Sequence, residues 1–127
     1  MSETLERILY VEDDEDIAEV ARIVFEDLGG FSVCHCSSGF AALEQVSAFK
    51  PQLVLLDMMM PGMDGVETHR RMKNAGVLDD VPVVFMTARA QHHEQEAYVA
   101  LGALGVIVKP FDPMSLCDEL RALWCAR

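Results

Sequence analysis

Four short, almost uninterrupted apolar runs constrain the fold of this chain more than any other feature of its sequence. They occupy residues 8–11, 53–56, 83–86 and 106–108. Runs of this length without alternating polar residues are typical of strands buried on both faces of a parallel sheet. The segment 31–36 is less uniformly apolar, so we expect it to be a fifth strand at an edge of that sheet.

Segments with helical spacing of apolar residues lie between and after these runs. They cover residues 17–28, 42–46, 64–72, about 91–101 and 112 onwards. Asp64 has the form of a capping box with Glu67 and opens the third helix. Asp112 is the expected cap of the fifth helix, with Pro113 in its first turn. Five βα units with right-handed crossovers predict a doubly wound α/β fold, in which helix layers cover both faces of a flavodoxin-like five-stranded parallel sheet.

Length and composition limit the class of protein. The chain has 127 residues, 51% of them hydrophobic, which suits one domain with a buried core. We expect a cytosolic protein, because no apolar stretch approaches a membrane span and the first residues do not resemble a signal peptide. The formal net charge of −11 disfavours direct binding to nucleic acid. The four cysteines are expected to be unpaired core residues rather than disulfides or zinc ligands.

Polar residues follow all four apolar runs. They are Glu12, Asp13 and Asp14 after the first run, Asp57 after the second, Thr87 after the third and Lys109 after the fourth. Each alone has a structural explanation as a helix cap, a turn residue or a solvated strand end. In an open α/β sheet, however, ligands bind at the carboxyl ends of the strands, where these residues converge. Converging carboxylates repel one another and recruit a hard cation such as Mg²⁺, and with Lys109 they would form a pocket that accepts a phosphoryl group.

Over essentially its whole length, the chain resembles the receiver domains of two-component response regulators. The matching motifs are Glu12-Asp13, the segment 57–65 with the sequence Asp-Met-Met-Met-Pro-Gly-Met-Asp-Gly, Thr87-Ala88, and Lys109-Pro110-Phe111. The resemblance implies a single receiver domain over residues 1–127, without an output domain in this chain. It also implies that a sensor histidine kinase or a histidine phosphotransfer protein donates a phosphoryl group from phosphohistidine, and that an effector of unknown identity reads the result.

The resemblance implies a role for each matching residue. Asp57 would be the phosphoacceptor, and the hydroxyl of Thr87 and the ammonium of Lys109 would bind the phosphoryl group. Mg²⁺, or Mn²⁺ in its place, would be held by four residues: Asp57 and Asp13 directly, Glu12 through a water molecule, and Met59 through its backbone carbonyl. The bond between Lys109 and Pro110 would be cis.

Two features bear on how such a domain would behave. Val106 stands three residues before Lys109, where the family usually has the Tyr or Phe that turns inward on phosphorylation. We therefore expect phosphorylation to perturb mainly the loops around Asp57 and Thr87. Met59 and Arg89 flank the path by which water would attack the acyl phosphate, so we expect a long-lived phosphorylated state.

Three other functions are compatible with parts of the pattern. Asp14-Glu15-Asp16 has the Asp-x-Asp form of a metal-dependent phosphatase, although it lies beyond the strand end, and sustained turnover of a phosphomonoester would favour that enzyme. A flavin-binding module shares the architecture but needs a loop rich in Ser and Thr after the first strand. An interaction module that is never phosphorylated is disfavoured, because every expected site residue is present. We expect a phosphoacceptor that catalyses only its own phosphorylation and dephosphorylation.

Overall fold

A five-stranded parallel sheet forms the centre of the computed structural model, which describes residues 4–78, 80–88 and 92–127. The strands are β1 (Arg7–Val11), β2 (Ser32–Cys36), β3 (Leu53–Asp57), β4 (Val83–Thr87) and β5 (Gly105–Val108). Their order in the sheet is β2-β1-β3-β4-β5, and every neighbouring pair is parallel. The prediction of a doubly wound parallel sheet is confirmed, and β2 lies at an edge as expected.

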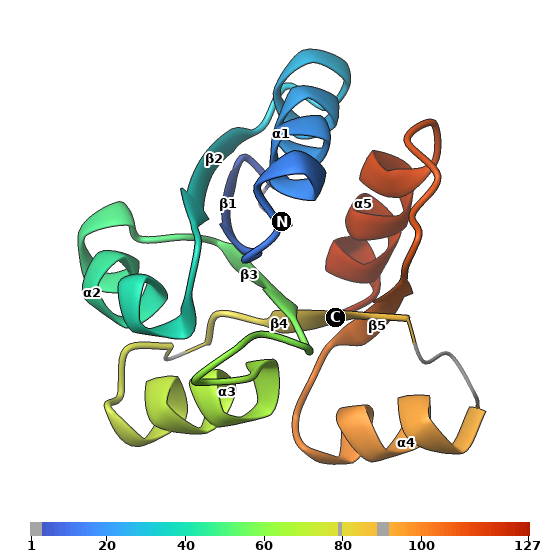
Figure 1. The fold of residues 1–127 in the computed structure, drawn as a ribbon. Helices are drawn as coiled ribbons and strands as arrows, with labels where there is room; N and C mark the ends of the chain where they lie inside the picture. Colours follow the sequence, from blue (N-terminus) through green and yellow to red (C-terminus); the bar gives the residue numbers. More distant parts are fainter. Residues whose placement is uncertain (1–3, 79, 89–91) are drawn as a thin grey trace.

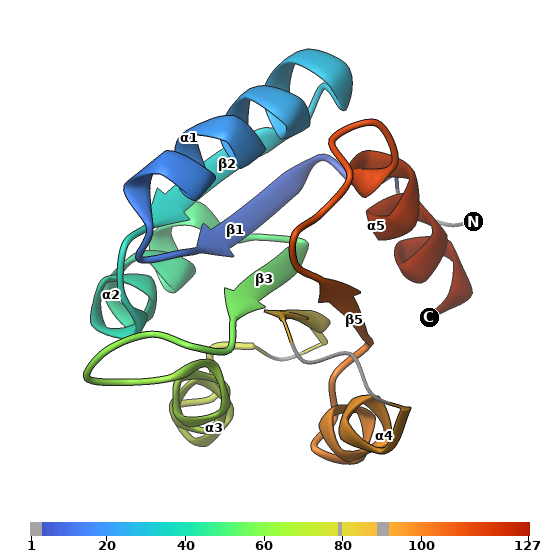
Figure 2. The ribbon, with the colours of Figure 1, turned by 45° about the vertical axis from the view of Figure 1, so that its right-hand side comes forward.

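Helices cover both faces of the sheet (Figure 1). The described helices are α1 (Glu15–Ile23), which continues as the π-helical turn η1 (Val24–Leu28), α2 (Gly39–Phe49), α3 (Gly65–Asn74), α4 (His92–Ala100) and α5 (Leu116–Ala126). The view turned by 45° shows α1 and α5 on one face and α2, α3 and α4 on the other (Figure 2). No helix in the described part of the chain is both long and apolar enough to cross a membrane.

The core consists of two apolar layers, one on each side of the sheet. Phe25 of η1 and Leu120 of α5 pack on one face, and Ala42 of α2 and Met72 of α3 pack on the other. All residues of β3 and β4 are buried, which is the reason their sequences lack polar alternation. The central strands are therefore rigid supports for the residues that follow them.

The helix starts agree only partly with the sequence predictions. Oδ1 of Asp64 accepts a hydrogen bond from the N–H of Glu67 (2.8 Å) and caps α3 as predicted. The carboxylate of Glu67 does not complete a capping box but pairs with Arg70 and Arg71.

The predicted start of α5 at Asp112 is wrong, because regular helix begins at Leu116. Oδ1 of Asp112 instead accepts a hydrogen bond from the N–H of Met114 (2.9 Å), which closes a local turn one turn before the helix. Pro113 lies in that turn and not in the first turn of the helix.

Candidate functional site

Adjacent strands place the predicted site residues at one edge of the sheet. Asp57 and Thr87 end the neighbouring strands β3 and β4, while Glu12 and Lys109 directly follow β1 and β5. The N–H of Lys109 donates a hydrogen bond to the carbonyl of Thr87 (2.8 Å), which extends the pairing of β4 with β5 up to the site. The Lys109–Pro110 peptide bond is cis, as the resemblance implied.

Three carboxylates converge at this edge. Glu12, Asp13 and Asp57 each offer an oxygen atom, and these atoms all lie within 4.8 Å of one another. Glu12 and Asp57 are 1% and 3% exposed, whereas Asp13 is more open to solvent. Oxygen ligands at this spacing fit a hard divalent cation such as Mg²⁺, which would offset the mutual repulsion of the carboxylates.

The side chain of Lys109 bridges two of these carboxylates. Its Nζ lies 2.6 Å from Oε1 of Glu12 and 3.2 Å from Oδ1 of Asp57. Burial alone would lower the pKa of Lys109, but the hydrogen bonds and charges of Glu12 and Asp57 outweigh it and raise the pKa above its usual value. The site therefore holds a permanent positive charge next to Asp57.

The carboxyl group of Glu12 has a raised pKa. Burial raises its pKa to about 7, with a further increase from Asp57 and a partial opposing effect from Lys109. Its Oε2 accepts a hydrogen bond from the N–H of Asp14 (3.3 Å), and its backbone carbonyl lies 2.9 Å from Nε2 of His35. A carbonyl oxygen only accepts hydrogen bonds, so Nε2 of His35 carries a hydrogen atom and donates it to this carbonyl.

Tyr10 is a partner of the site that the sequence predictions missed. Its hydroxyl donates a hydrogen bond to Oε1 of Glu12 (3.4 Å), and its side chain is fully buried. Burial raises the pKa of Tyr10 well above its usual value, and the charges of Glu12 and Asp57 raise it further, so the phenol keeps its proton. A signal was present in the sequence, since a buried tyrosine in an otherwise aliphatic run needs a hydrogen-bond partner.

The loop after β3 packs tightly against Asp57. Oδ1 of Asp57 accepts a hydrogen bond from the N–H of Met59 (3.3 Å), and the carbonyl of Met58 accepts one from the N–H of Gly65 (3.1 Å). A Cβ atom at Gly65 would lie 2.5 Å from the backbone oxygen of Asp57, so only glycine allows α3 to start here. Met59 itself is 69% exposed.

The Asp-x-Asp pattern does not contribute an aspartyl nucleophile. Oδ1 of Asp14 accepts hydrogen bonds from the N–H groups of Asp16 and Ile17 (3.0 and 3.1 Å), so this residue is the N-cap of α1. Asp16 lies in the first turn of the helix. The polar residues that do meet at the sheet edge are those of the receiver pattern.

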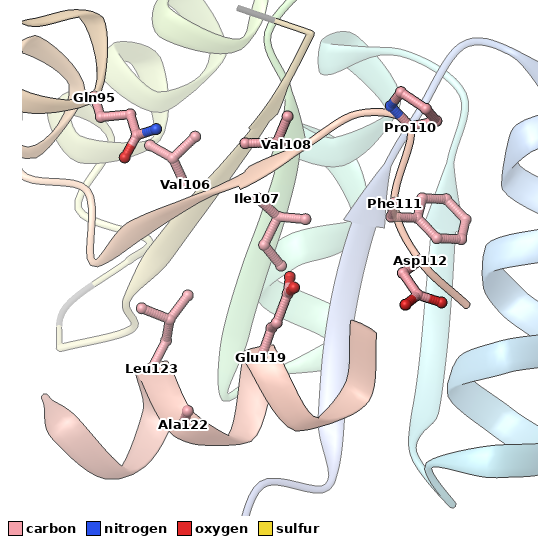
Figure 3. A pocket seen from close by; sticks show the side chains of 10 residues that line it. All are labelled: Gln95, Val106, Ile107, Val108, Pro110, Phe111, Asp112, Glu119, Ala122 and Leu123. Carbon is pink, nitrogen blue, oxygen red and sulfur yellow. The ribbon is translucent and has the colours of Figure 1, made fainter. Parts of the chain in front are cut away.

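Thr87 and Val106 are the remaining predicted residues that the structure describes. Thr87 is buried at the end of β4, and Arg89 lies outside the described residues. Val106 is half-buried and lines a groove of about 570 Å³ between α4, β5 and α5. Figure 3 shows Val106 and Leu123 on the walls of this groove. The position that usually carries an aromatic ring thus holds a short side chain beside open space.

Comparisons with known proteins agree with this geometry. The family model described as "response regulator receiver domain" matches residues 8–121. The transcriptional regulatory protein CseB of Streptomyces coelicolor is 36% identical over 91% of this chain and 48% of its own length. The phosphate regulon transcriptional regulatory protein PhoB of Escherichia coli K12 is 34% identical over 92% of this chain and 51% of its own. The chain thus spans about half the length of these curated relatives.

Solved structures show the same fold. The chemotaxis response regulator CheY4 of Vibrio cholerae superposes with a TM-score of 0.85 at 25% sequence identity. The superposition covers 94% of this chain and 99% of that chain. The similarity therefore extends over the complete sheet and the helices that cover it.

Proposed function

Because this chain belongs to the receiver domains of two-component response regulators, we propose that it takes a phosphoryl group onto Asp57 from a phosphohistidine. The donor would be a sensor histidine kinase or a histidine phosphotransfer protein. One phosphoryl group would be transferred per chain, in contrast to the repeated turnover of a phosphatase.

One observation carries the proposal: Asp57 lies in a cluster of acidic and basic side chains of the kind that this transfer requires. Asp57 is 3% exposed, and its carboxylate lies 3.2 Å from the ammonium of Lys109. Glu12 and Asp13 place two further carboxylates within 4.8 Å of it. Phosphoryl transfer depends mainly on positioning and on neutralisation of oxygen charge, and this cluster of side chains supports both.

The transfer follows from the roles of these side chains. A carboxylate oxygen of Asp57 attacks phosphorus, the P–N bond of the phosphohistidine breaks, and the imidazole leaves with the bonding electrons. The acyl phosphate then carries negative charge on its free oxygens. The ammonium of Lys109 offsets part of this charge, and the hydroxyl of Thr87 can donate a hydrogen bond to one of the oxygens.

The acidic residues give the site its metal dependence in this proposal. Glu12, Asp13 and Asp57, with the backbone carbonyl of Met59, would hold Mg²⁺ or, in its place, Mn²⁺. The bound ion would neutralise charge on the phosphoryl oxygens. Asp13 and Glu12 then serve to keep the ion beside Asp57, which alone becomes modified.

The setting of the domain forms part of the same proposal. CseB and PhoB are transcriptional regulators by name, and this chain matches about half of each, so we infer that an effector domain or protein reads the phosphorylated state. With a net charge of −11, the chain itself is a poor ligand for nucleic acid. Its four cysteines are free, which suits the reducing cytoplasm. Cys36 and Cys117 are buried as expected, but Cys34 is only partly buried and Cys125 is exposed, so the expectation of four core cysteines is wrong.

The proposed acceptor is tested by intact mass spectrometry after incubation with acetyl phosphate and Mg²⁺. We expect one added phosphoryl group on the native chain and none on Asp57→Asn, which removes the nucleophile and keeps the shape of the side chain. Asp14→Asn, which alters only the cap of α1, should be labelled as well as the native chain. Undiminished labelling of Asp57→Asn would overturn the assignment.

A further inference from the structure

The side chain of Glu12 is contacted by a residue of the strand that it directly follows. Tyr10 lies in β1 and Glu12 directly follows this strand two positions later, where the two side chains meet. The phenol of Tyr10 is fully buried, and its hydroxyl lies 3.4 Å from Oε1 of Glu12. In the described part of the chain, Glu12 is the one hydrogen-bond partner that the structure gives this hydroxyl.

The ring of Tyr10 is fixed by its neighbours. Its centroid lies 5.6 Å from that of Phe25, in an edge-to-face arrangement, and 5.8 Å from that of His35. His35 is the register partner of Tyr10 on β2, and its Nε2 lies 2.9 Å from the backbone carbonyl of Glu12. Tyr10 and His35 therefore contact the side chain and the main chain of the same residue.

A glutamate at this position needs such support. Its side chain has three rotatable bonds, and the ammonium of Lys109, which lies 2.6 Å from Oε1, is itself at the end of a flexible chain. The phenol of Tyr10, by contrast, is carried by a rigid strand and a buried ring. A fixed donor of this kind limits the orientations of the Glu12 carboxylate beside Asp57.

We propose that Tyr10 is a positioning residue for the metal site: its hydroxyl orients the Glu12 carboxylate and thereby strengthens the binding of Mg²⁺. This inference rests on the proposed function and assigns a role to a residue outside the receiver motifs. Groups that hold metal ligands in place commonly contribute tenfold or more to metal affinity. We expect about a tenfold effect.

The first experiment compares Mg²⁺ dissociation constants measured by isothermal titration calorimetry. Tyr10→Phe removes the hydroxyl and retains the ring contacts, and it should raise the dissociation constant about tenfold. The matched control is Tyr98→Phe, because Tyr98 is the other tyrosine of the chain and packs on Phe85 (5.7 Å between centroids), away from Glu12. This control should bind Mg²⁺ like the native chain.

A double-mutant cycle separates positioning from a general effect on the core. In Glu12→Asp the carboxylate is one methylene shorter and no longer reaches the hydroxyl, so adding Tyr10→Phe should change the affinity no further. Unchanged Mg²⁺ binding by Tyr10→Phe, an equal loss in Tyr98→Phe, or a full effect of Tyr10→Phe in the Glu12→Asp background would each overturn the inference.

A metal-free measurement distinguishes this inference from the proposed function. In Tyr98→Phe protein, Tyr10 is the remaining tyrosine, and loss of its hydrogen bond in the additional Glu12→Asp variant should shift its ultraviolet absorption band to shorter wavelength. An unshifted band refutes the contact between Tyr10 and Glu12. If the native chain neither binds Mg²⁺ nor becomes phosphorylated, the proposed function fails, whatever the band shows.

Discussion

The ammonium nitrogen of Lys109 lies 2.6 Å from Oε1 of Glu12, yet burial and the neighbouring Asp57 still raise the pKa of that carboxyl group to about 7. Between the ordinary value of 4.5 and about 7, the folded chain holds a proton on Glu12 that the unfolded chain has released. In metal-free protein, this proton stabilises the folded chain relative to the unfolded chain at low pH. The stabilisation is lost as the pH rises through that window.

Mg²⁺ binding should have the opposite pH dependence. The ion favours the ionised carboxylate, so binding releases the proton of Glu12, and affinity should rise by up to about tenfold per pH unit until about pH 7. Calorimetric titrations at several pH values measure this slope. Glu12→Gln cannot release a proton and should flatten the profile over the same range, whereas a slope that persists in this variant would assign the proton to another group.

Mg²⁺ should also stabilise the fold through Asp13. A ligand that binds only the native state at about 100 times its dissociation constant adds about 2.7 kcal/mol to the free energy of unfolding. Asp13→Ala should remove most of this gain, as measured by thermal unfolding with and without millimolar Mg²⁺. Asp27→Ala removes an exposed carboxylate from η1, away from the site, and should keep the gain. Equal stabilisation of both variants is the result that excludes the proposed metal site.

Gly65 should tolerate no side chain. A Cβ atom there would lie 2.5 Å from the backbone oxygen of Asp57 and 3.0 Å from Cα of Met58. Alanine favours a helix by about 1 kcal/mol over glycine, but the clash with backbone should outweigh this, and we expect Gly65→Ala to lose about 1–3 kcal/mol of stability. Urea unfolding measures the loss, which should be accompanied by slower labelling with acetyl phosphate. Asn74→Ala, at the other end of α3, is the control and should label normally.

Val106 should limit the structural change that phosphorylation of Asp57 causes over residues 99–107. Its short, β-branched side chain has neither the reach nor the two well-separated positions of an aromatic ring. With beryllofluoride, an acyl-phosphate mimic, we expect large backbone-amide NMR shifts beside Asp57 and Thr87 and smaller ones over residues 99–107. Val106→Tyr supplies the ring next to a groove of about 570 Å³ and should increase the shifts over 99–107. Large shifts there in the native chain would contradict the hypothesis.

The buried strands and the site were predictable from sequence for the same physical reason. A strand covered on both faces must be apolar, so β3 and β4 appear as uninterrupted runs, and the residues that follow such runs meet at one edge of the sheet. Asp57 and Lys109 could therefore be placed together without knowledge of their distance.

Features that depend on tertiary packing were not predictable in this way. Asp112 has the chemistry of a helix cap, but the helix begins where Leu116 can pack into the core, so the aspartate closes a turn instead. The change of α1 to a π-helical turn at Val24 leaves no mark in the apolar spacing. Tyr10 stands out in the sequence as a tyrosine in an aliphatic run, but the partner of its hydroxyl is not known until the position of Glu12 is known.

The hydrogen bond from the N–H of Lys109 to the carbonyl of Thr87 has a consequence for how such a domain diversifies. Because main chain joins main chain, the backbone positions of Thr87 and Lys109, the two residues proposed to bind the phosphoryl group, keep their separation whatever side chains surround them. The face around Val106, Glu119 and Leu123 lies outside this frame and can accumulate substitutions without altering it. The surface of that face can therefore change during evolution while the backbone that carries the proposed phosphoryl chemistry at the strand ends is retained.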